Sequence, residues 1–283
     1  MNTIKLVALV ALVSVMLDAG LHANRKSLVN ALKDVRLLGR ACLANFIIVP
    51  LAAVLIVHGL DLDTFIGIGI LWMAIAPGVP FVARTAGKMA GGREDLAVDL
   101  TFLLPIISVV TIPLTAPLVL PQVGEAHANM GQYMTKLVLF QLLPLVVGLI
   151  IADRAPHFAK VLERPLALLF AASVVVLVIL LIPDLSRAVM AIQGSRGILA
   201  IMLIVIVSLV AGWLVAEDPI EHRHTISVAT ALRNVGLCLS IAAGYDRHTV
   251  AASVMTYFLV QFLLVFAMTT RYRRSTRRAH APA

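Results

Sequence analysis

Nine apolar runs fill most of the chain, and each is long enough to cross a lipid bilayer as a helix. The hydrocarbon core of a bilayer is about 30 Å thick, so a helix needs about 20 predominantly apolar residues to cross it. The loops between the runs are short and leave no room for a separate water-soluble domain. The runs cover residues 3–22, 37–58, 64–83, 96–121, 132–152, 165–183, 197–216, 225–243 and 249–270.

The composition fits a membrane protein and excludes a water-soluble or a disordered one. Apolar residues make up 60% of the 283 residues and charged residues only 13%, whereas a soluble domain is about half apolar and about a quarter charged. The runs lack the alternation of polar and apolar residues that marks the strands of a membrane barrel. Helices satisfy their own backbone groups in lipid, so the predicted fold class is an all-α polytopic membrane protein with nine transmembrane helices.

The distribution of Lys and Arg predicts the orientation of these helices. With the C-terminus in the cytoplasm, 17 of the 23 basic residues lie in inside segments, 5 lie outside, and Arg233 lies within a span. Cytoplasmic loops of membrane proteins carry this kind of excess, which places the N-terminus outside. The net charge of +8 therefore reflects membrane topology, and we expect no nucleic-acid partner.

The first run is expected to remain as a span, because Asp18 interrupts its end and no Ala-x-Ala cleavage site follows it. The Ala-, Val- and Leu-rich composition and the short loops favour a bacterial protein in the inner (plasma) membrane, in contact with the lipid bilayer. The sequence leaves the organism and the oligomeric state open.

Two runs contain residues that interrupt a straight helix. These residues are Pro77, Gly78 and Pro80 in the third run, and Arg233, Asn234 and Gly236 in the eighth. Interruptions at corresponding places in two halves of a chain are typical of secondary transporters. They predict a single transporter domain, 1–283, made of a first repeat, 1–121, that lacks its first helix, and a second repeat, 122–283. The fifth run, 132–152, lies between two blocks of four helices. Because this single helix crosses the membrane once, the second block enters the membrane from the opposite side, so the two repeats are inverted.

Arg233 is the sharpest candidate for a functional residue. It lies about eight residues from either end of its run, roughly 12 Å from the interface, and an arginine at this depth costs at least about 2.5–3.5 kcal/mol. We expect it to face a cavity and to meet an anion, in substrate binding or in coupling. The alternative is a structural ion pair, most plausibly with Asp99. Asp99 could itself carry a proton, partner Arg233, or lie at a solvated helix end.

Other polar side chains lie inside the apolar runs, where buried amides and hydroxyls need hydrogen-bond partners. They are Asn45, Thr101, Ser227, Thr230 and Asn234. Each could ligate a substrate or a cation, or could bond neighbouring helices. We favour a place in the site for the two asparagines and helix bonding for any single hydroxyl.

Enzyme and metal chemistry have no support in the sequence. The eight histidines lie in loops or at helix ends, no two of them share a run, and Cys42 and Cys238 have neither disulfide nor metal-ligand spacing. No zinc-protease, hydrolase-elbow or Walker A motif is present. We therefore expect no enzyme, no metal site and no cofactor, with sodium or proton coupling possible.

Several short motifs, taken in order, resemble those of the bile acid:sodium symporter family in its nine-helix form. The resemblance covers nearly the whole chain, and the order and spacing of the motifs are more specific than any one of them. The motifs are Met16–Leu21, Asn45–Pro50, Ala76–Gly78, Gly91–Ala97, Pro144 with Gly148, and Arg233 with Asn234.

The resemblance implies a panel domain and a core domain, in which two broken helices cross. Organic anions bind near that crossing and sodium ions bind beside it. The family's sodium-binding glutamate falls on Ala229 and its glutamine falls on Arg233, while its other sodium-site positions fall on Val82, Ala83 and Ala97. Near-retained or retained positions are Asn45, Thr101 and Asn234.

This departure leads to a specific hypothesis for the function. Loss of the glutamate and gain of Arg233 change the local charge by about two units, so a guanidinium could stand where a sodium ion would. The predicted function is secondary active transport of a small organic anion fixed by Arg233, coupled to protons or uncoupled. The alternatives are a sodium-coupled symporter with a relocated ion site and a membrane sensor or partner protein that does not transport.

Overall fold

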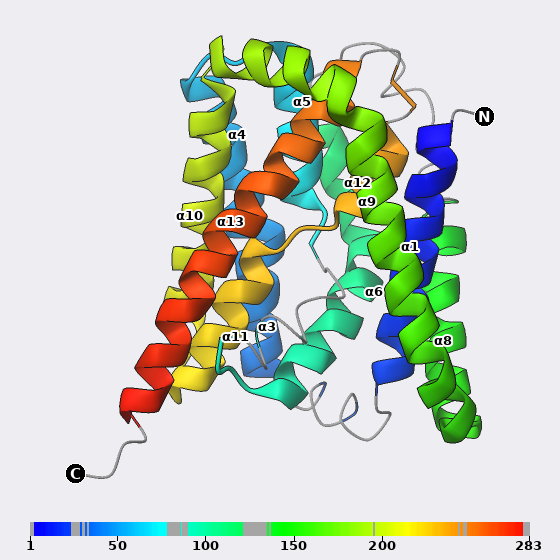
Figure 1. The fold of residues 1–283 in the computed structure, drawn as a ribbon. Helices are drawn as coiled ribbons and strands as arrows, with labels where there is room; N and C mark the ends of the chain where they lie inside the picture. The colour runs from blue at the N-terminus through cyan, green and yellow to red at the C-terminus, as the bar shows by residue number, and fades with distance from the viewer. Residues whose placement is uncertain are drawn as a thin grey trace.

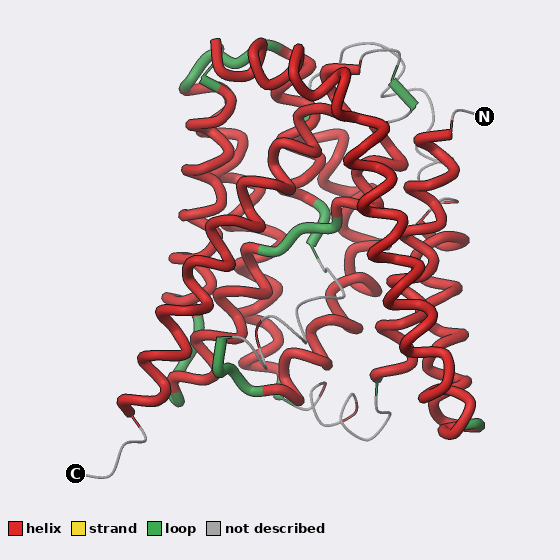
Figure 2. The backbone as a smooth tube through the Cα atoms, viewed as in Figure 1, coloured by secondary structure: helices red, strands yellow, loops and turns green. Residues whose placement is uncertain are grey.

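A computed structural model describes residues 3–23, 29, 32, 34–77, 86, 90–120, 135, 137–194, 196–242, 244–245 and 248–279. Within these residues the chain is helical apart from short connections and one isolated backbone bridge (Figures 1 and 2). The all-helical prediction is therefore confirmed. The elements are α1 (Thr3–His22), α3 (Val35–Leu43), η1 (Ala44–Ile48), α4 (Val49–Gly59), α5 (Thr64–Ile75), α6 (Glu94–Val119), η4 (Leu137–Leu142), α8 (Leu143–Arg154), α9 (Pro156–Gly194), α10 (Gly197–Val215), α11 (Ile220–Ala231), α12 (Val235–Ala242) and α13 (His248–Ala279), where η marks a π-helix.

Five helical segments of the described chain are long and apolar enough to cross a membrane. They are Val35–Gly59, Glu94–Val119, Leu137–Arg154, Gly197–Val215 and Thr249–Arg274. Two shorter apolar helices, Leu6–His22 and Thr64–Ile75, accompany them. The protein is thus an integral membrane protein with several spans, and the count of nine stays a prediction.

The helices pack in two groups. Helix α1 lies along α8 and α9 on one side of the molecule, while α4, α5, α10, α11 and α13 pack against one another on the other side (Figure 1). Helix α12 contacts both α1 and α13, so it joins the groups. The start of α1 and the end of α13 lie at opposite ends of the molecule, as an odd number of membrane crossings requires.

Small residues allow the helices of each group to approach closely, as is usual in membrane bundles. A Cβ atom added at Gly148 of α8 would lie 2.9 Å from the Cα atom of Gly20 in α1. A Cβ atom at Gly69 of α5 would lie 2.7 Å from the Cβ atom of Ser253 in α13, and one at Gly212 of α10 would lie 2.6 Å from the Cα atom of Ser227 in α11. Backbone-to-backbone contact at these three crossings sets the spacing of the bundle.

The span 35–59 contains a π-helical turn that changes its hydrogen bonding. At the end of η1, the Val49 N–H donates to the carbonyl of Ala44, five residues earlier. The next residue, Pro50, has no N–H to donate. The carbonyl of Asn45 is therefore left without a helical donor and is available to a side chain from elsewhere in the fold.

The glycine contact between α1 and α8 leads to a first prediction. Gly148→Ala should lower the stability of the protein by about 1–3 kcal/mol, because the added methyl group overpacks a backbone contact. The measurement is the melting temperature of the detergent-purified protein. Gly39→Ala is the matched control, since a Cβ atom there meets nothing within 4 Å and alanine favours helix. Equal melting temperatures of the two variants would contradict the packing described above.

Candidate functional site

The two interrupted helices meet in the middle of the molecule. Helix α5 ends at Ile75, α11 ends at Ala231, and the chain is extended beyond both ends. Pro77 and Arg233 form an antiparallel backbone bridge, and the Asn234 N–H donates to the Ala76 carbonyl over 2.9 Å. Figure 2 shows these loop segments between helices at mid-height of the bundle.

The local sequence explains why the helices stop here. Pro77 has no N–H to extend α5, and the Ala76 N–H closes a tight turn onto Met73 instead. Asn234 starts α12 as its N-cap, because its side-chain Oδ1 accepts from the Leu237 N–H over 3.1 Å. Gly236 lies in the first turn of α12, beyond the break. Gly78 and Pro80 lie outside the described residues.

Backbone groups freed by the second break are satisfied by partners from other helices, as lipid requires. The Arg233 N–H donates to Oε1 of Gln261 in α13 over 3.1 Å. The side-chain amide of Asn234 donates to Oε1 of Gln141 in η4 over 3.2 Å. Gln141 in turn donates to the Pro105 carbonyl and to the Ser108 hydroxyl of α6, each over 2.8 Å. The break is therefore held in place from α6, η4 and α13.

The Arg233 side chain is fully buried and only partly satisfied. Its Nη1 donates to the free carbonyl of Asn45 over 3.4 Å. Its Nε and Nη2 form no hydrogen bond of regular geometry with the described residues, and none of their carboxylates pairs with the guanidinium. The arrangement leaves one buried positive charge with two unused donors.

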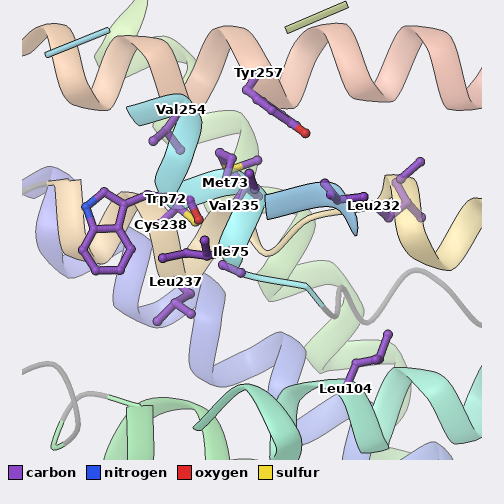
Figure 3. Close-up of a cluster of buried hydrophobic side chains, with 14 of the residues drawn as sticks. Trp72, Met73, Ile75, Leu104, Leu232, Val235, Leu237, Cys238, Val254 and Tyr257 are labelled. Carbon is purple, nitrogen blue, oxygen red and sulfur yellow. The ribbon is translucent and has the colours of Figure 1, made fainter. Parts of the chain in front are cut away.

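The Tyr257 phenol of α13 lies near the guanidinium. Its hydroxyl is buried and interacts with the Arg233 side chain, outside the strict geometry of a hydrogen bond. In Figure 3, Tyr257 extends from α13 towards the break, with Cys238, Val235 and Leu232 below it. Two buried polar groups without regular hydrogen bonds at several of their atoms thus lie close together at the break.

The structure brings four of the predicted site residues together. Arg233 and Asn234 form the break, and Asn45 approaches them from η1. The side-chain amide of Asn45 donates to the Thr230 hydroxyl over 3.2 Å and to the Ala41 carbonyl over 2.9 Å. The Oδ1 atom of Asn45 has no hydrogen-bond partner within the described part of the chain.

The other three predicted residues have different surroundings. The Ser227 hydroxyl bonds to the Leu209 carbonyl and to the Tyr272 hydroxyl, so it ties α11 to α10 and α13. The Thr101 hydroxyl donates to the carbonyl of Ala97 in its own helix. Asp99 is buried in the second turn of α6, and no ion pair among the described residues joins it to Arg233.

Sequence reasoning missed several residues that build the site. Gln141 and Gln261 hold the second break, Ser108 supports Gln141, and Tyr257 lies beside the guanidinium. A signal for the two glutamines was present, because each is an amide surrounded by apolar residues in its run. Tyr257 had no such signal, since an aromatic residue in a span is ordinary.

The positions that would hold sodium in the resembled family offer few oxygen atoms here. Ala229 and Ala97 are fully buried and have no side-chain oxygen. Val82 and Ala83 lie outside the described residues. No group of three or more His, Cys, Asp or Glu side chains that could hold a metal occurs in the searched part of the chain.

A polar cluster lies at the other end of α11, away from the break. The Arg93 guanidinium pairs with Asp95 at 2.7 Å and contacts Nε2 of His222 at 2.9 Å. Burial lowers the pKa of His222, so its imidazole is neutral at pH 7 and accepts from Arg93. The Arg93 N–H donates to the Thr225 hydroxyl over 2.8 Å. These contacts tie the start of α6 to the start of α11.

Comparisons with known proteins point to one family. The sequence model of the Sodium Bile acid symporter family matches residues 9–191, which is more than half of the chain and ends before the second break. The human P3 protein is 24% identical over 207 residues, which make up 70% of this chain and 42% of the human protein. The chain thus corresponds to less than half the length of that relative.

The capping contact of Asn234 leads to a second prediction. Asn234→Ala removes the N-cap of α12, worth about 1 kcal/mol, and takes away the donor to buried Gln141, which costs about 1–3 kcal/mol. We expect a lower melting temperature and faster amide exchange in α12. Ser240→Ala is the control in the same helix, because the Ser240 hydroxyl bonds to the Leu237 carbonyl of its own helix. Similar exchange in both variants would argue against the network.

Proposed function

Because the chain belongs to the sodium bile acid symporter family, we propose that it is a secondary transporter that carries a small organic anion across the membrane. The family is one of membrane transporters and not of enzymes. The observation that carries the proposal is the buried Arg233 guanidinium at the crossing of two broken helices, with two donors unused by the described residues.

The energetics of Arg233 favour a ligand over a purely structural role. An arginine at the middle of a membrane costs at least about 2.5–3.5 kcal/mol, and a buried charge is normally paired. Here the described residues supply one long hydrogen-bond acceptor, the Asn45 carbonyl, and no carboxylate. An anionic substrate would pair with the guanidinium. Its release would leave the charge unpaired again, as is expected at a site where a transporter binds and releases its substrate.

The proposed architecture is nine spans in two inverted repeats, 1–121 and 122–283, with α5 broken in the first and α11–α12 broken in the second. Backbone pairing between the two breaks supports it, as do the chain ends at opposite ends of the molecule. The excess of Lys and Arg in alternate loops supports an N-terminus outside and a cytoplasmic C-terminus, in a bacterial inner membrane.

We propose further that the protein does not use the usual sodium sites of its family. Two unit charges 4 Å apart repel by about 4 kcal/mol at an effective dielectric constant of 20, so a sodium ion beside Arg233 is disfavoured. Ala229 supplies no carboxylate to offset that repulsion. Arg233 then provides the positive charge that a bound cation would otherwise bring, and coupling is to protons, with Asp99 as the candidate carrier, or is absent.

The third prediction tests the role of Arg233 in transport. Arg233→Gln should reduce uptake by proteoliposomes at least about tenfold, the equivalent of about 1.4 kcal/mol in binding, because the charge that fixes the anion is lost. The assay uses a panel of radiolabelled acids that includes propionate, lactate and benzoate. Arg223→Gln is the matched control, since Arg223 lies at the start of α11, the helix that ends just before Arg233, and pairs with exposed Asp218. Equal uptake by both variants would overturn the assignment of Arg233.

The fourth prediction concerns coupling. Replacing sodium by potassium should change neither uptake nor melting temperature. A ligand that binds only the folded protein raises its melting temperature, so a protein without a sodium site should gain nothing from sodium. Stabilisation by sodium would instead favour a sodium-coupled symporter with a relocated ion site. Absence of uptake of every acid in the panel, together with a stable purified protein, would favour a sensor or partner protein that does not transport.

A further inference from the structure

We propose that the exposed arginines at the end of α13 bind the headgroups of anionic phospholipids, such as phosphatidylglycerol. This surface lies away from the helix crossing, and the inference is independent of the proposed transport. No Asp or Glu follows Asp246 in the sequence, so the last helix and the residues beyond it carry no formal negative side-chain charge. The same segment contains five closely spaced arginines, which are Arg271, Arg273, Arg274, Arg277 and Arg278.

The arginines begin where α13 leaves the hydrocarbon core of the membrane. From His248 to Arg271 the helix rises about 35 Å along its axis, enough to cross a core of about 30 Å with some tilt. The apolar span ends at Arg274, whereas the helix continues to Ala279. The helix therefore enters the headgroup layer while it is still regular, and its arginines enter that layer with it.

Aromatic side chains mark the same level of the membrane. Tyr272 stacks on Trp213 of α10, with 5.3 Å between ring centroids, and on His224 of α11, with 4.4 Å. The Tyr272 and Ser227 hydroxyls are hydrogen-bonded over 2.9 Å. Trp and Tyr are enriched at the membrane–water interface, at the level of the headgroups. The arginines next to Tyr272 thus lie at the depth where lipid phosphates occur.

The same tyrosine fixes which face of α13 turns away from the bundle. Tyr272 is buried, whereas Arg271, Arg273 and Arg274 are exposed. Successive residues of an α-helix are turned by about 100°, so these arginines lie about 100–160° around the helix from the tyrosine. In Figure 1 this end of α13 lies at the lower left edge of the bundle. The packing that buries the tyrosine therefore leaves the arginines open to lipid headgroups.

The carboxylates of the neighbouring loop do not neutralise this arginine face. The loop between α10 and α11 contains Glu217, which pairs with Arg40, and Asp218, which pairs with Arg223 at 3.1 Å. No ion pair within the described part of the chain includes an arginine of α13. A cluster of about four to eight basic residues directly beyond a membrane helix is typical of a site for anionic lipids.

Membrane topology alone does not account for this arrangement. An excess of Lys and Arg on one side orients a membrane protein, and that effect is counted over the loops as a whole. Here the charges share one helix whose end is docked by a stacked tyrosine. Guanidinium groups donate paired hydrogen bonds to phosphate oxygens. A clustered, positioned set of arginines can therefore hold a headgroup, which the same charges scattered among loops could not.

The first test compares two lipids added to the full-length, detergent-purified protein. Phosphatidylglycerol should raise the melting temperature more than phosphatidylcholine with the same acyl chains, because a ligand that binds only the folded protein stabilises it. Potassium chloride at about 1 M should remove the difference, since the Debye length is then only about 3 Å. Equal stabilisation by the two lipids, or a difference that persists at high salt, would overturn the inference.

Paired variants locate the site, with lipid binding followed by native mass spectrometry. Arg271→Gln combined with Arg274→Gln should weaken phosphatidylglycerol binding at least about tenfold, because each basic residue at the surface adds to the attraction. Glutamine favours helix about as well as arginine, so the fold should survive. The matched control combines Arg154→Gln with Arg164→Gln, two exposed arginines of α8 and α9 on the same predicted side. Equal loss in both pairs would overturn a site on α13.

Two further probes distinguish other partners of the arginine face. Glycerol 3-phosphate and soluble polyglutamate should each stabilise the protein less than phosphatidylglycerol does. Equal stabilisation by glycerol 3-phosphate would assign the face to a free organophosphate, and stronger stabilisation by polyglutamate would assign it to an acidic protein segment. Either result would overturn the lipid site and leave the proposed transport standing, because none of these measurements depends on uptake.

Discussion

The contact on which the rest of the site depends is the backbone pairing between two interrupted helices. The Asn234 N–H donates to the Ala76 carbonyl, and Pro77 faces Arg233 across an antiparallel bridge. A break in a membrane helix exposes polar backbone groups that lipid cannot satisfy. The pairing gives part of this freed backbone a partner inside the bundle. The same pairing places the Arg233 side chain inside the bundle.

The freed backbone groups also recruit side chains that have no role in an ordinary span. Gln261 reaches the Arg233 N–H, and Gln141 joins Asn234 to the proline-containing helix α6. The carbonyl of Asn45 becomes an acceptor because a π-helical turn and Pro50 deprive it of helical donors. Irregular backbone in three spans therefore converges on one guanidinium, which explains how a single charge is oriented without a carboxylate from the described residues.

The proposed loss of the family's sodium-site residues would have one physical consequence at the crossing. A sodium ion needs several oxygen ligands and a compensating negative charge, and Ala229 offers neither. A fixed guanidinium supplies positive charge without an ion that must be bound and released. The proposed transporter thereby gains an anion site that is independent of sodium, and the energy for uphill transport must come from another gradient.

Hydropathy and the charge of the loops were enough to predict an all-helical membrane protein, because lipid leaves few alternatives for a polar backbone. Pro77 and Arg233 marked the two interruptions, since neither residue is usual in the middle of a membrane helix. The sequence also singled out Asn45, Asn234 and Thr230, since polar groups in apolar runs are conspicuous, and the structure places them near Arg233. The roles of Gln141, Gln261 and Tyr257 were decided only by tertiary structure, as was the absence of an ion pair between Arg233 and Asp99 among the described residues. These depend on which helices lie side by side and on how each is rotated, and periodicity along one helix carries no information about the neighbour it will face.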